Sequence, residues 1–143
     1  MRTRNPVAAL AVVSALGGGL ATAGVATAAT TLHATLSGRS EVPPAGNGSG
    51  SATLTLNVKK RQICFKITLK NVGTTMAGHI HKGGRTTAGP VFVPLFSQAT
   101  KHPKGCVSAP KADIRAIRKH PRRYYVNVHT AAYRGGAARG QLH

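Results

Sequence analysis

Residues 51–58, SATLTLNV, and residues 62–69, QICFKITL, each alternate apolar and polar side chains without a break. A period of two over this length is typical of a β-strand that buries one face and exposes the other to water. The link between the two segments is only Lys59, Lys60 and Arg61. Such a short polar link predicts that the two strands form a hairpin.

Shorter apolar segments extend the same pattern on both sides of the hairpin. We expect further strands at residues 32–36, 76–80, 91–96, 124–128 and 141–142. Glycine- and proline-rich stretches separate these segments, as expected for turns between short strands. Together these features predict an all-β fold, a Greek-key sandwich or barrel, rather than a helical protein.

One segment has the pattern of a helix, at residues 111–119. Ile114 and Ile117 are spaced to lie on one side of the helix, where they would pack against the sheet. Pro110 suits the first turn, Ser108 is a candidate cap, and Pro121 stops the helix.

The N-terminus predicts export. Arg2 and Arg4 precede an apolar stretch at residues 7–16, and Ala26, Thr27 and Ala28 form a small-residue cleavage site. An alternative is a retained anchor, because residues 6–29 carry no charge and could just span a bilayer. We expect cleavage, which gives a signal peptide at residues 1–28, a single domain at residues 29–143, an extracellular location and no stable membrane insertion of the mature chain.

The chain has two cysteines, Cys64 and Cys106. In an exported protein two cysteines are expected to form a disulfide. Cys64 occupies a polar-face position of its strand, so we expect the bond to fasten a crossing segment to the outside of the sheet.

The composition is strongly basic, with 20 Lys and Arg, two acids and a formal net charge of +18. Loss of residues 1–28 would remove two of the basic residues and neither acid, which leaves +16. Basic clusters lie at residues 59–61, 101–104 and 115–123.

Such a basic chain is attracted to anionic surfaces, and an exported one meets anionic cell-envelope polymer or extracellular polysaccharide. Specific nucleic-acid binding is not expected, because no aromatic residues are interleaved with the basic clusters. A merely solubilising surface is the alternative.

Three histidines are candidates for chemistry. His79 and His81 lie two residues apart, so in a strand both would project from the same side. His129 is the last residue of the segment YYVNVH, and with Tyr125 and Asn127 it would point outward if Val126 and Val128 face the core. If these strands are neighbours, three imidazoles meet on one exterior face, which is a workable geometry for copper or zinc. Hydrogen bonding of the same histidines to loops is the alternative.

Four separated motifs, in order, resemble the CHRD (chordin-type) domain family. They are EVPP at residues 41–44, AGHIHKG at 77–83 with GPVFVPLF at 89–96, YYVNVHT at 124–130 and RGQL at 139–142. The chain departs from the family pattern at residues 76–78, MAG, where paired alanines are more common before the histidine. CHRD domains occur in chordin, an extracellular antagonist of growth factors, and in secreted microbial proteins. The resemblance implies a β fold and an extracellular location, but no particular activity.

Glu41 is one of only two acids, and we expect it to form a structural ion pair with Arg139 that holds the two ends of the domain together. No catalytic residues are predicted, since the serines lie in no nucleophile motif and no phosphate-binding loop is present. The sequence thus favours a secreted non-catalytic binding or structural module that engages anionic material. The alternative is a copper- or zinc-binding protein that uses His79, His81 and His129.

Overall fold

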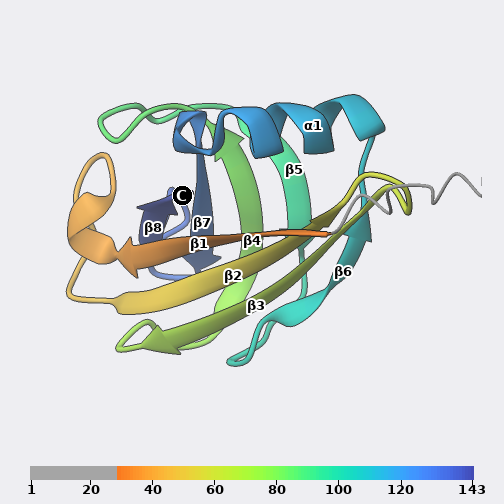
Figure 1. Ribbon diagram of the computed structural model, residues 1–143. Coiled ribbons are helices and arrows are strands. Elements are labelled where there is room, and N and C mark those ends of the chain that lie inside the picture. Colours follow the sequence, from red (N-terminus) through yellow and green to blue (C-terminus); the bar gives the residue numbers. More distant parts are fainter. Residues whose placement is uncertain (1–28) are drawn as a thin grey trace, which may run out of the picture.

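The computed structural model describes residues 29–143, so the predicted signal peptide lies outside the described residues. The described chain is mainly β, with one α-helix and two 3-10 turns (Figure 1). The elements are β1 (Thr30–Ser37), η1 (Gly38–Ser40), β2 (Ser49–Asn57), β3 (Gln62–Lys70), β4 (Thr75–Lys82), β5 (Val91–Phe96), β6 (Lys104–Ser108), α1 (Lys111–Lys119), η2 (Pro121–Arg123), β7 (Tyr124–Thr130) and β8 (Ala138–Gln141).

The eight strands form one antiparallel sheet in the order β5-β4-β7-β8-β1-β2-β3-β6, which curls until it is nearly closed into a barrel. The chain crosses between β3 and β4, between β5 and β6, and through α1 between β6 and β7, because none of these pairs is adjacent in the sheet. Figure 1 shows β1, β2 and β3 crossing in front of β4, β5 and β7. The predicted all-β class with one short helix is confirmed.

The core lies between these two halves of the sheet. Leu54 and Phe65 are cross-strand partners in the predicted hairpin, and both are buried. The other apolar members of the alternation are buried too, except Val58 and Leu69, which are partly buried. Phe65 on β3 stacks on Phe96 of β5 with ring centroids 5.9 Å apart, so the end strand β5 contacts β3, which lies next to the other end of the sheet. The alternation of apolar and polar residues therefore correctly predicted which side chains of β2 and β3 face the core.

The helix begins at Lys111 and ends at Lys119, as predicted, and fully buries Ile114 and Ile117. Figure 1 shows α1 at the top of the view, lying across one end of the strands. Its cap differs from the expectation. Pro110 occupies the N-cap position with no side-chain cap bond, because Ser108 still belongs to β6. No helix within residues 29–143 has the length and apolar character needed to cross a membrane.

Cys64 and Cys106 form the predicted disulfide. The partner segment was not foreseen as a strand. Residues 104–108 are β6, which pairs antiparallel with β3 and places Cys106 directly opposite Cys64. The bond therefore joins two neighbouring strands at the edge of the sheet instead of fastening a crossing segment to its outside.

Candidate functional site

The three predicted histidines lie on neighbouring strands. Ile80 is fully buried in the core, so His79 and His81 on either side of it project from the opposite, outer face of β4. β4 pairs with β7, with His79 opposite Asn127 and Ala77 opposite His129. His129 is therefore a diagonal neighbour of His79 on the same face. The sequence-predicted grouping of these residues is present in the structure.

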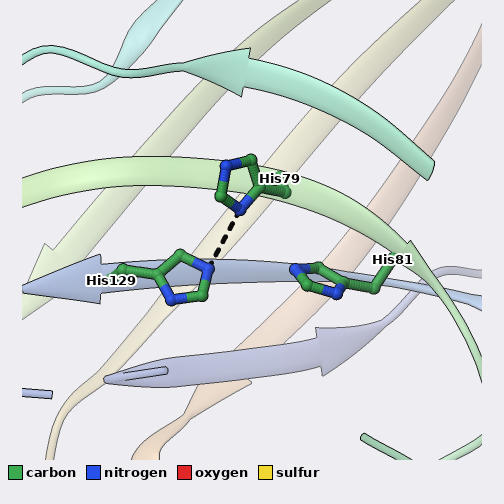
Figure 2. A group of neighbouring side chains, drawn as sticks. All are labelled: His79, His81 and His129. Carbon is green, nitrogen blue, oxygen red and sulfur yellow. Dashed lines mark hydrogen bonds between the residues drawn. The ribbon is translucent and has the colours of Figure 1, made fainter. Parts of the chain in front are cut away.

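Figure 2 shows a nitrogen of each imidazole facing the space between the three rings. The three candidate ligand nitrogens all lie within 4.8 Å of one another. His79 Nδ1 and His129 Nε2 are 3.0 Å apart and share a hydrogen bond. Ligand nitrogens around a tetrahedral zinc ion are separated by about 3.3 Å, since each Zn–N bond is about 2.0 Å. Small side-chain adjustments would bring the group to that geometry.

Backbone carbonyls orient two of the rings. His81 Nδ1 lies 2.9 Å from the carbonyl oxygen of Gly89, and His129 Nδ1 lies 2.9 Å from that of Arg134. A carbonyl oxygen only accepts hydrogen bonds, so each Nδ1 carries the hydrogen and each Nε2 keeps its lone pair in the neutral ring. Histidines that bind metals typically donate their other ring N–H to a carbonyl in this way.

Loops cover much of this outer face, contrary to the expectation that it is open to water. Tyr125 and Asn127 are buried, and His81 is only 8 % exposed. The loop at residues 83–90 covers His81, and the Gly89 N–H donates to the Tyr125 hydroxyl at 2.9 Å. His79 and His129 remain half-buried, beside a cavity of about 430 Å³. That cavity is lined by Met76, Ala77, His79, His129, Thr130, Ala131 and Arg134.

Burial keeps the three imidazoles neutral. It lowers the pKa of His79 to about 4, and the charge that His129 and His81 carry when they are protonated lowers it further. Burial also lowers the pKa of His81 and of His129, although the carbonyls of Gly89 and Arg134 favour the charged rings and oppose the shift. Neutral imidazoles near pH 7 can bind a cation without first losing a proton.

Three buried polar atoms in this layer have no hydrogen-bond partner: His81 Nε2, Asn127 Oδ1 and Glu41 Oε1. Asn127 and Glu41 are linked to each other at 3.4 Å, and Asn127 sits diagonal to His81 across β4 and β7. Each of the three atoms can offer a lone pair. Buried lone pairs without donors are unfavourable unless a water or a cation satisfies them. Of these atoms, His81 Nε2 belongs to the group of three histidine nitrogens within 4.8 Å of one another, and its free lone pair fits a bound cation.

Comparison with protein families identifies the domain. The family model described as the CHRD domain matches residues 32–142. The chain belongs to the CHRD family. No curated protein and no solved structure matched it. The predicted family is thus confirmed, and the β4 and β7 segments that carry the three histidines lie within the matched part of this CHRD domain.

The side chains of Glu41 and Arg139 are both buried, but no hydrogen bond joins them, so the predicted paired contact is absent among the described residues of this CHRD domain. Arg139 donates to the carbonyls of Thr87 and Gly84, at 2.9 and 2.8 Å, and its guanidinium lies 3.5 Å from the ring centroid of Tyr125. These partners satisfy the guanidinium away from the carboxylate. Burial raises the pKa of Glu41 to about 7, and the charge of Arg139 and the bond from Asn127 only partly offset it.

The backbone joins the chain ends that the ion pair was expected to hold. β8 pairs with β1, with Ser37 opposite Arg139. His33 and His143 exchange two backbone hydrogen bonds, at 2.9 and 3.0 Å.

Sequence reasoning missed the groups that orient the CHRD histidines. The carbonyls of Gly89 and Arg134 carry no sequence signal, because every residue has a carbonyl and only the fold decides which one meets a ring. Asn127 was placed on the correct face, but its burial and its contact with Glu41 could not be read from spacing. The basic clusters named above also do not gather at the site.

Proposed function

We propose that this CHRD domain is an extracellular, non-catalytic module that binds a copper or zinc ion through His79, His81 and His129. One observation carries the proposal. His81 Nε2 is buried without a partner and belongs to a group of three neutral imidazoles whose candidate ligand atoms lie within 4.8 Å of one another. Histidines that only tied loops together would satisfy both ring nitrogens with loop atoms.

The donor set suits these two metals. Copper(II) and zinc both accept imidazole nitrogen, and three protein ligands leave a further position for water or another small ligand. The half-buried edges of His79 and His129 border the 430 Å³ cavity, which supports access for an ion from solvent.

Calorimetric titration with Cu(II) and Zn(II) tests the proposal. We expect submicromolar binding of one ion by the purified domain, and its loss in the His79→Ala/His81→Ala variant. The matched control is His102→Ala/His120→Ala, which removes two exposed imidazoles elsewhere and is expected to bind normally. Circular dichroism checks that each variant folds. Binding weaker than about micromolar, or equal binding by both variants, contradicts the proposal.

A second candidate function is attachment to anionic envelope polymer or extracellular polysaccharide. The formal charge of +18 supports it, and so does the burial of Glu41, which hides one of the two acids from any partner. Retention on an immobilised anionic polymer should fall steeply as salt is added, because salt screens exposed charges. Retention that is unchanged in high salt contradicts it.

Extracellular location is part of both proposals. The disulfide and the CHRD family membership support it, since disulfides persist in oxidising compartments. Mass spectrometry of protein secreted by the source cells should find a mature N-terminus near residue 29, and a full-length, cell-retained chain would contradict this.

A further inference from the structure

Two cavities that share lining residues lie beside β8, and their linings contain none of His79, His81 and His129. The larger has a volume of about 490 Å³, and its lining includes Arg39, Arg85 and Arg139. The smaller has a volume of about 360 Å³, and its lining includes Arg85 and Arg122. Both cavities share Arg85 and Gln141, so they lie side by side. We call the two together the arginine groove, after Arg39, Arg85, Arg122 and Arg139.

The charged side chains that are exposed in the arginine groove are all basic. Arg39, Arg85 and Arg122 are exposed and available to a ligand. The only acid in the lining of either cavity is Glu41, which is 5 % exposed. Burial favours the neutral form of its carboxyl by raising its pKa to about 7. An anion in the groove therefore meets guanidinium groups with little opposing charge.

The floor of the groove is rigid. Arg139 is fixed by the carbonyls of Gly84 and Thr87, on either side of Arg85. Gln141 Nε2 lies 2.7 Å from the carbonyl of Gly83 and 2.7 Å from that of Arg122. These bonds fix the backbone that carries Arg85 and Arg122, so less conformational entropy is lost when their side chains engage a ligand.

We propose that the arginine groove binds a linear polymer with a carboxylate or phosphate on each repeating unit, through Arg39, Arg85 and Arg122. The guanidinium fork matches both oxyanions with two parallel hydrogen bonds. Two neighbouring cavities, each lined by arginines, suit successive charged units better than one small anion. No Phe, Tyr or Trp lines either cavity, so the groove lacks the large aromatic surfaces on which single-stranded nucleic acids stack. This inference rests on the second candidate function and is independent of the metal site.

Binding measurements with two polymers and two variants test the assignment. The probes are polygalacturonate for carboxylates and inorganic polyphosphate for phosphates, at low and at physiological salt. The test variant is Arg85→Ala/Arg122→Ala. The matched control is Lys59→Ala/Lys60→Ala, which removes the same charge from exposed positions outside the groove. We expect the arginine variant to weaken binding roughly tenfold and the lysine variant less than about twofold, since contact charges matter more than distant screened ones.

Each outcome has a defined meaning. Weaker binding of either polymer by the arginine variant, with unchanged binding by the lysine variant, supports the groove. The polymer whose binding is weakened identifies the oxyanion. Equal losses in both variants overturn the assignment, because net charge alone would then explain binding. Absence of binding to both polymers also overturns it, together with the second candidate function. Single-stranded DNA that binds more tightly than both polymers and depends on the same arginines overturns the proposed ligand class. Copper titration of the arginine variant reports separately on the metal site.

Discussion

The Nδ1–H of His81 donates to the carbonyl oxygen of Gly89 at 2.9 Å, which leaves the Nε2 of the same ring buried and without a partner. This bond joins β4 to the loop that follows it and fixes both the tautomer and the plane of the ring. A ring held in this way is preorganised to bind a cation with its free nitrogen.

Gly89 cannot carry a side chain without moving this loop. A Cβ atom there would lie 1.8 Å from the carbonyl oxygen of Lys82. We expect Gly89→Ala to shift the carbonyl away from His81 and to weaken metal binding by about 10- to 100-fold, as loss of such supporting contacts typically does. Gly84→Ala is the control in the same loop, since a Cβ there meets no atom within 4 Å. Equal metal affinity of the two variants in calorimetry would show that the Gly89 contact does not support the site.

Metal binding should persist to lower pH than at an exposed histidine site. Protons compete with a metal for the imidazole nitrogens, and the pKa of His79 is lowered from 6.5 to about 4. The affinity should therefore change little between pH 7.5 and 6, where ordinary imidazoles begin to protonate, and should be lost as the pH approaches about 4. Titrations across this range measure the profile. A tenfold fall in affinity for each pH unit below about 6.5 would contradict the neutral, buried state of the rings.

Glu41 should make the stability of the fold depend on pH in the direction opposite to that of a carboxylate in a salt bridge. Its pKa is raised from 4.5 to about 7, so between these values the folded state holds a proton that the unfolded state has lost. Stability from this group is therefore present at low pH and declines as the pH rises through that window.

The free energy of unfolding of the natural protein should fall relative to that of Glu41→Gln by at most about 3 kcal/mol between pH 4.5 and 7.5. Guanidinium denaturation of both proteins at several pH values measures the difference, in which the contributions of the histidines cancel. Curves that remain parallel across the window would show that Glu41 is not perturbed.

The disulfide should contribute to stability without affecting the metal site. Cys64 and Cys106 are 42 residues apart, and in the chain-entropy model closing such a loop is worth about 4 kcal/mol. We expect Cys64→Ser/Cys106→Ser to lower the free energy of unfolding by about 2–4 kcal/mol. Its copper affinity should be unchanged at temperatures where it remains folded, because β3 and β6 are not neighbours of β4 and β7. Denaturation and titration of the same preparation check both parts.

Strands and their buried faces were predictable where a single segment showed a clear alternation of apolar and polar residues. Leu54 and Phe65 are buried because each belongs to an uninterrupted alternation, and the same rule placed His79 and His81 on one face of β4. The strand at β6 was missed because its five residues, KGCVS, have no clear alternation and gain their pairing from β3.

The Glu41–Arg139 ion pair was predicted from the scarcity of acids, but the fold offered Arg139 two carbonyls and the ring of Tyr125 instead. The contacts of a buried charge depend on which loops cover it, and composition carries no information about that.

By itself, the sequence determined the β class, the cysteine pair, the CHRD membership and the face on which the histidines lie, because periodicity and motifs are properties of neighbouring residues. Only the tertiary structure decided that loops bury His81 and that the carbonyls of Gly89 and Arg134 orient the rings. It also decided that Arg39, Arg85 and Arg122 line two neighbouring cavities. These relationships join residues far apart in the chain, and they form only when backbone hydrogen bonding and core packing bring the strands and loops together.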